Sequence, residues 1–105
     1  MANIVKIKAV LIQVDGTSKE VTLTGNTLRE LQKLVGGYIE VVSGIILDRP
    51  DIVMVINEEG KLMGLPTNII ASILYGDTIV GDAILIGERN GDFDTLSNWE
   101  LWKSW

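Results

Sequence analysis

A polar stretch between Val55 and Asn68, reading V-I-N-E-E-G-K-L-M-G-L-P-T-N, holds the residue types best suited to binding chemistry. Asn57 and Gly60 tolerate the backbone conformations of the tight turn that is expected directly after an apolar strand. Pro66 fits the first turn of a helix, where backbone N–H groups have no partner within the helix and can receive an acceptor. The stretch therefore predicts a rim of polar groups around a polar ligand.

The predicted rim has further members inside and outside this stretch. Glu58 adds a carboxylate, and Asn68 adds an amide that both donates and accepts hydrogen bonds. Gly36, Gly37 and Tyr38 are expected neighbours that offer a flexible backbone and an aromatic face. Asn68 is expected to carry most of the binding, so that Asn68→Ala weakens it and leaves thermal stability nearly unchanged.

Each of these features also has a purely structural interpretation. The glycine pair is typical of a helix C-cap that is followed by a strand. The segment from Asn57 to Gly60 is typical of a solvated turn, and Pro66 with Asn68 is typical of a helix start with an exposed amide.

Enzyme chemistry is not expected, because the chain has neither histidine nor cysteine. This composition excludes Ser–His and Cys–His pairs, imidazole and thiolate ligands of zinc, and disulfides. Catalysis would have to rest on Glu58, Glu59 or Asp82 without a visible partner. The run Asp92-Phe93-Asp94 lacks the further oxygen ligands of a calcium loop, so we predict a solvated turn and no metal site. No cofactor is expected.

The charge and hydropathy of the chain limit its partners. The net charge is −5, and the nine Lys and Arg residues are scattered, which argues against a nucleic-acid surface. The longest apolar runs have four or five residues, whereas a membrane-spanning helix needs about 20. No export signal is recognised, so cytoplasmic residence is the default expectation.

The elements that would position these groups form one α+β domain over residues 1–105, a mostly antiparallel sheet with two or three short helices packed on it. A helix is predicted over Thr27–Val35, with Thr27 and Glu30 as a capping box and Gly36-Gly37 as its end. A shorter helix is predicted from Pro66 to Gly76-Asp77. The predicted strands are Ile4–Val14, Val21–Leu23, Tyr38–Ser43, Ile52–Ile56, Thr78–Val80 and Ala83–Gly87. The first of them is expected to have an apolar side, with Val5, Ile7, Ala9 and Leu11, and a side that carries Lys6 and Lys8.

Three tryptophans, Trp99, Trp102 and Trp105, crowd the end of the chain, where Ser97 and Glu100 have capping-box spacing and predict a terminal helix. One interpretation is that they anchor this helix on the sheet. The other is that they form partner or subunit contacts, which predicts a homo-oligomer.

Several segments, in this order and spacing, resemble a family of small acidic proteins of phages, plasmids and Gram-positive bacteria that is known as a domain of unknown function. They are L-Q-K-L-V-G-G-Y-I-E-V-V (Leu31–Val42), I-N-E-E-G-K-L (Ile56–Leu62), L-P-T-N (Leu65–Asn68), I-V-G-D-A-I-L-I-G (Ile79–Gly87) and D-F-D-T-L-S (Asp92–Ser97). The resemblance implies a fold and a genomic setting more than a chemistry.

Two function classes follow from this setting. The first is a non-catalytic sponge in the host cytoplasm, which sequesters a nucleotide-derived immune signal such as a cyclic nucleotide or a cyclic ADP-ribose isomer. The second is a protein-binding inhibitor or adaptor that acts on a host defence protein or nuclease. The even distribution of charge favours the sponge slightly, because a mimic of nucleic acid needs a denser acidic face.

Overall fold

The computed structural model describes residues 6–43 and 50–96. Within them the chain forms a six-stranded sheet and two helices, which confirms the predicted α+β class. The elements in chain order are β1 (Ile7–Ile12), β2 (Ser18–Leu23), α1 (Thr27–Val35), β3 (Ile39–Val42), β4 (Ile52–Asn57), α2 (Ile69–Tyr75), β5 (Ala83–Arg89) and β6 (Asp92–Asp94).

The strands lie in the order β2-β1-β5-β4-β3, and every neighbouring pair is antiparallel. β6 pairs with the last residues of β5, beyond the part of β5 that pairs with β1. β2 and β3 are therefore the edge strands of the main sheet.

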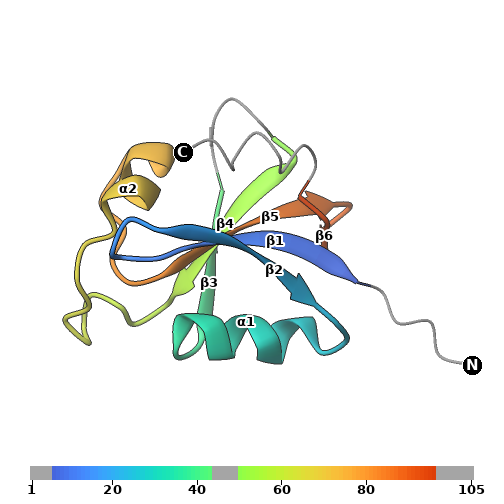
Figure 1. Cartoon of the computed structure of the whole chain (residues 1–105), viewed down its shortest axis with the longest axis horizontal. Helices are drawn as coiled ribbons and strands as arrows, with labels where there is room; N and C mark the ends of the chain where they lie inside the picture. The colour runs from blue at the N-terminus through green and yellow to red at the C-terminus, as the bar shows by residue number, and fades with distance from the viewer. Residues whose placement is uncertain (1–5, 44–49, 97–105) are drawn as a thin grey trace, which may run out of the picture.

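The two helices cover opposite faces of the sheet (Figure 1). Leu31 of α1 packs in a cluster with Val53 and Ile84, while Leu74 of α2 packs in a second cluster with Met54. β4 and β5 consist of nearly continuous apolar residues because alternate side chains must fill both clusters.

The strand pattern differs from the sequence prediction in two ways. The first strand was expected to have one apolar side, but within β1 both sides are buried, with Ala9 and Leu11 on the α1 face and Val10 and Ile12 on the α2 face. The predicted strand Thr78–Val80 is reduced to an isolated bridge between Val80 and Thr67. Two further backbone hydrogen bonds hold these segments together, from the N–H of Asn68 to the carbonyl of Ile79 and from the N–H of Gly81 to the carbonyl of Pro66, each at 2.8 Å.

The bounds of α1 agree with the prediction, but its cap does not. Asn26, and not Thr27, is the N-cap residue, and its Oδ1 accepts from the backbone N–H of Arg29 at 3.3 Å. The Glu30 carboxylate accepts from the backbone N–H of Thr24 at 3.0 and 3.1 Å. The predicted capping box requires the N–H of Thr27, three residues later. Gly36 ends α1 with a φ of 81°, as predicted.

The second helix begins later than predicted. α2 starts at Ile69, and Asn68 is its N-cap residue, so Pro66 lies in the extended approach to the helix and not in its first turn. The predicted terminal helix and Trp99, Trp102 and Trp105 lie outside the described residues. None of the helices in the described part of the chain is long and apolar enough to cross a membrane.

Candidate functional site

Asn57 ends β4 and ties the following turn to the end of α1. Its Nδ2 donates to the backbone carbonyl of Val35 at 3.1 Å and lies 3.6 Å from the sulfur of Met63. Its Oδ1 accepts from the backbone N–H of Glu59 at 2.8 Å, which closes the turn. The side chain is buried, and this set of bonds gives Asn57 a structural role at the base of the predicted rim.

A shallow groove of about 350 Å³ opens beside Asn57, at the C-terminal end of α1. It brings together four of the predicted residues, Gly36, Gly37, Tyr38 and Asn57. Three residues that the prediction did not include complete it, namely Gln32, Glu59 and Met63. Tyr38 is 67% exposed, so its ring is available to a ligand.

The described residues that line this groove carry no positive charge. Its described lining has a carboxylate, Glu59, but no Lys or Arg. The end of α1 also carries the partial negative charge of a helix C-terminus. The backbone N–H groups of Gly36 and Gly37 are already used, since both donate to the carbonyl of Gln32.

Asn68 lies away from this groove and is 0% exposed. Its Nδ2 donates to the carbonyls of Ile12 and Gly81, each at 2.9 Å, and its Oδ1 accepts from the N–H of Ala71 at 3.1 Å. The amide is thus fully engaged within the protein, and we withdraw the expectation of an exposed amide that meets a ligand. The sequence offered a signal for this role, because asparagine is a favoured N-cap residue.

Gly60 is buried and Pro66 is exposed, and neither residue lines the groove beside Asn57. A Cβ built on buried Gly60 would lie 3.0 Å from a methyl group of Val80, which explains why a glycine occupies this position. The carbonyl of Pro66 accepts from the N–H of Gly81 at 2.8 Å. Only part of the predicted rim therefore forms one surface.

Glu58 lines a second groove, of about 270 Å³, between the β3 edge of the sheet and the end of α2. The apolar wall of this acidic groove includes Val42, Ile56 and Tyr75. Its charged lining has three carboxylates and one ammonium group, from Glu40, Glu58, Asp77 and Lys61.

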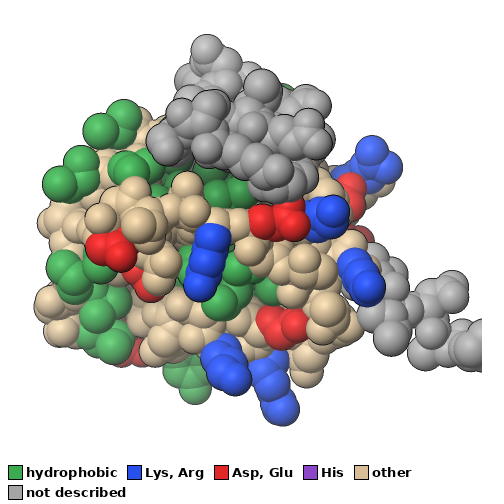
Figure 2. Space-filling view, viewed as in Figure 1, with side chains coloured by type: hydrophobic (Ala, Val, Ile, Leu, Met, Phe, Trp, Pro, Cys, Tyr) green, Lys and Arg blue, Asp and Glu red, His purple; other side chains and the backbone are tan. Residues whose placement is uncertain are grey.

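Exposed aliphatic side chains lie on α2 and on the segment after β4, a feature that the sequence prediction missed, and one of them, Leu62, lines the acidic groove. Leu62, Ile69 and Ile73 are 87%, 68% and 74% exposed. Figure 2 shows hydrophobic side chains over α2 at the upper left and over the segment after β4 farther down the left side, with acidic side chains between them. The recurrence of isoleucine at positions 69 and 73, on the helix face opposite buried Ala71, was a signal for this surface.

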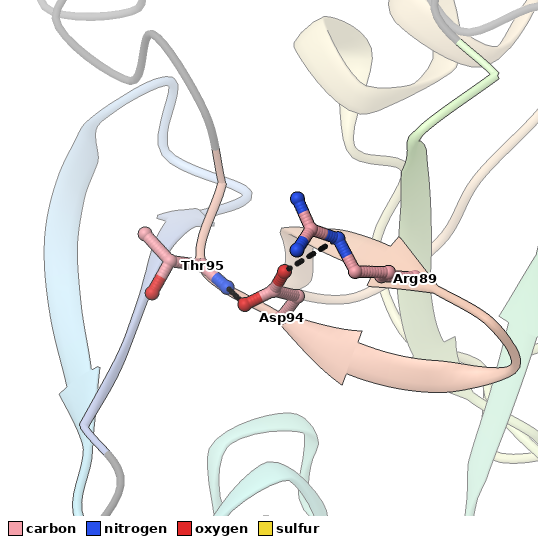
Figure 3. Close-up of polar contacts among 3 residues, drawn as sticks. All are labelled: Arg89, Asp94 and Thr95. Carbon is pink, nitrogen blue, oxygen red and sulfur yellow. Dashed lines mark hydrogen bonds and ion pairs between the residues drawn. The ribbon is translucent and has the colours of Figure 1, made fainter.

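The hairpin of β5 and β6 carries a separate polar cluster (Figure 3). Arg89 Nε lies 3.6 Å from Asp94 Oδ2, and Asp94 Oδ1 accepts from the N–H of Thr95 at 2.8 Å. The solvated turn predicted at Asp92-Phe93-Asp94 was wrong, because these residues form β6. The turn lies just before them, at Asn90 and Gly91, which both have a positive φ. In the described part of the chain, no group of three or more acidic side chains is placed to hold a metal ion.

These features belong to a small antiparallel α+β protein with grooves beside one sheet edge. The chain belongs to the family described as domain of unknown function DUF3846, whose model matches residues 7–103. No protein of curated function matches the chain in sequence.

The fold is also similar to part of a solved structure, the crystal structure of small RNA methyltransferase HEN1. The TM-score is 0.64 at 18% sequence identity, and the match covers 98% of this chain but 16% of that chain. A likeness at this identity is evidence for the fold alone.

Proposed function

We propose that this protein is a non-catalytic binding protein that acts as an inhibitor or adaptor by contacting another protein. The observation that carries the proposal is the exposure of three aliphatic side chains, Ile69 and Ile73 on α2 and Leu62 at the acidic groove. In the phage setting that the resemblance implies, the target is a defence protein or nuclease in the host cytoplasm.

A partner that covers these exposed side chains removes their apolar surface from water, which makes binding more favourable. Burial of apolar surface contributes about 25 cal/mol per Å². Leu62 lines the acidic groove, so an apolar contact there has carboxylates at its rim. An apolar centre with a polar rim is the usual composition of a protein interface.

Serine substitutions at exposed positions test this proposal without disturbing the core. Ile73→Ser and Leu62→Ser remove apolar surface, and Leu28→Ser on α1, which is 52% exposed, is the matched control. We expect a host protein captured by the wild type to be lost with the first two variants and retained with the control. Capture that is unaffected by Ile73→Ser and Leu62→Ser would contradict the proposal.

The second candidate is the nucleotide sponge, and the groove at Tyr38 favours it. A volume of about 350 Å³ lies within the range of about 300–1,000 Å³ found for small-molecule pockets. The Tyr38 ring could stack on a base. The described lining of this groove contains no Lys or Arg that could pair with a phosphate group. The geometry therefore supports binding of a protein better than sequestration of a nucleotide.

Calorimetry against cyclic nucleotides and cyclic ADP-ribose isomers separates the two candidates. The sponge hypothesis predicts binding that Tyr38→Ala weakens by about tenfold, since base–aromatic stacking contributes about 1–3 kcal/mol. Leu28→Ser should leave that binding unchanged. Absence of binding across the panel, together with a stoichiometric protein partner, would remove the sponge from consideration.

A further inference from the structure

Within residues 6–43 and 50–96, one edge of the main sheet, strand β3, has no neighbouring strand on its outer side. Among these described residues β3 pairs only with β4, in the register Ile39↔Asn57 to Val42↔Met54. The backbone N–H of Glu58 donates to the carbonyl of Tyr38 at 2.8 Å, which makes Tyr38–Glu58 a hydrogen-bonded pair. Because such pairs alternate along an antiparallel ladder, the backbone groups of Ile39 and Val41 point away from β4.

The residues of β3 do little to block this edge. The opposite edge strand, β2, carries two adjacent charged residues, Lys19 and Glu20. β3 reads I-E-V-V, with neither lysine nor proline, and Val41 is exposed. Edge strands without such protection accept an added strand.

The side chains on either face of β3 define what an added strand should carry. Val42 packs in the α2 cluster, so Glu40 lies on the same face, where it lines the acidic groove. Ile39 packs in the α1 cluster, which places Val41 on the apolar side. Alternate residues of an added strand would thus meet carboxylates on one face and aliphatic groups on the other.

We propose that β3 receives an extended segment of the partner protein in which Lys or Arg alternates with apolar residues. The proposal rests on the proposed function and names the chemistry of its partner. The basic residues would lie over the acidic groove, with their stems against Tyr75 and Leu62 and their charges beside Glu40, Glu58 and Asp77. The net charge of −5 favours the approach of such a segment.

A short acetylated peptide of alternating lysine and valine is the probe, and the same peptide with glutamate in place of lysine is its control. We expect the lysine peptide alone to bind in calorimetry. In the wild type it should slow hydrogen exchange at the amides of Ile39 and Val41 but not at Thr22, whose N–H faces outward on the β2 edge by the same alternation.

Val41→Pro removes an outward N–H without removing a bond to β4, and proline is tolerated on edge strands. We expect Val41→Pro to weaken binding of the lysine peptide by about tenfold or more, because the backbone N–H is lost and the proline ring lies where the added strand would pair. Thr22→Pro is the matched control on the other edge.

The carboxylates of the acidic groove are tested separately. Glu40→Gln and Glu58→Gln should each weaken binding of the lysine peptide by about two- to fivefold, whereas Glu88→Gln, at an exposed position outside the groove, should not.

Four results would overturn the inference: no binding of the lysine peptide, equal binding of the glutamate peptide, binding that survives Val41→Pro, or a wild-type dimer that Val41→Pro converts to a monomer. The last would assign the edge to a second copy of this chain. If the peptide fails but a host protein is still captured through Ile73 and Leu62, the proposed function stands and the strand-addition mechanism does not.

Discussion

Asn68 joins three parts of the chain through a single side chain. Its amide nitrogen satisfies carbonyls at the end of β1 and at Gly81, while its oxygen caps α2. Its backbone N–H also donates to the carbonyl of Ile79 at 2.8 Å. The position therefore determines where α2 meets the sheet, and a substitution there should act on stability.

We expect Asn68→Ala to lower the free energy of unfolding by about 3 kcal/mol. A lost N-cap costs about 0.5–2 kcal/mol, and each buried carbonyl left without a donor adds about 1–3 kcal/mol. Asn26→Ala is the control, because Asn26 is an exposed N-cap that makes one such bond and should cost about 1 kcal/mol. Urea denaturation measures both. Equal losses in the two variants would show that the buried bonds of Asn68 contribute nothing.

The turn between β1 and β2 supplies a prediction about pH. The Thr17 hydroxyl donates to Asp15 Oδ1 at 2.6 Å, and the Thr17 N–H donates at 2.9 Å, so the pKa of Asp15 lies below its ordinary value of 3.8. Because the folded pKa is lowered, the stabilisation is present above pH 3.8 and is lost as the pH falls through the folded pKa.

We expect Thr17→Val to raise the pKa of Asp15 toward 3.8, since the hydroxyl bond is the largest cause of the shift. The titration of the Asp15 carboxyl carbon by NMR measures this change. Thr22→Val, at an exposed position on β2, should leave the midpoint of the Asp15 titration unchanged. An unchanged midpoint in Thr17→Val would assign the shift to another group.

At the scale of the elements, the close contact of β5 with the segment after β6 depends on Gly87. A Cβ built on Gly87 would lie 2.6 Å from the carbonyl oxygen of Thr95 and 2.9 Å from that of Asp94. Both obstacles are backbone atoms, so an added methyl group must displace the β5–β6 hairpin.

Gly87→Ala should therefore lower the free energy of unfolding by about 1–3 kcal/mol, as expected for overpacking. Gly25→Ala is the control, because no atom lies within 4 Å of its Cβ position and its φ is not positive. That variant should be neutral to within about 0.5 kcal/mol or slightly stabilising. Thermal unfolding followed by circular dichroism compares them, and coincident curves for the two variants would contradict the argument.

Much of the fold was predictable because local patterns determine it. The apolar stripe of α1 and the continuous apolar run of β4 predicted a helix and an interior strand correctly. The side assignment of β1 failed because Val10 and Ile12 are buried by α2, an element distant in sequence. The predicted start of α2 was wrong because Pro66 and Asn68 are both residue types favoured near the start of a helix. The hydrogen bonds from Asn68 to the carbonyls of Ile12 and Gly81 fix Asn68 as the N-cap residue.

The candidate site was predictable only where neighbouring positions in the chain also meet in space. Gly36, Gly37 and Tyr38 do meet Asn57, because β3 pairs with β4 beside the end of α1. Whether an asparagine faces solvent or a buried carbonyl cannot be read from local sequence. Asn57 and Asn68 both point inward because backbone carbonyls of other elements lie within hydrogen-bonding distance of their amides.

At the scale of the whole molecule, self-association through the C-terminal segment stays a prediction. Trp99, Trp102 and Trp105 lie outside the described residues, so the argument rests on composition. Burying a large apolar side chain contributes about 1.5–3 kcal/mol, and aromatic side chains dominate many interfaces. Deleting residues 99–105 should lower the mass measured by light scattering. A wild type that is already monomeric would refute the prediction.

The central strands couple the two halves of the molecule. Val53 and Val55 of β4 belong to the α1 cluster, while Ile52 and Met54 belong to the α2 cluster. Two cores that share the same strands should unfold together, because neither cluster keeps its packing once β4 separates from β5.

We therefore expect Leu31→Ala on the α1 face to loosen the α2 face as well. The substitution should cost about 2–5 kcal/mol, and hydrogen exchange at the slowest amides of α2 should accelerate by the same free energy as at those of α1. Leu74→Ala should show the reciprocal effect, which makes the two variants controls for each other. Acceleration confined to α1 in Leu31→Ala would mean that this helix opens alone. The sheet would then be a partition between independent layers and not the structure that unites them.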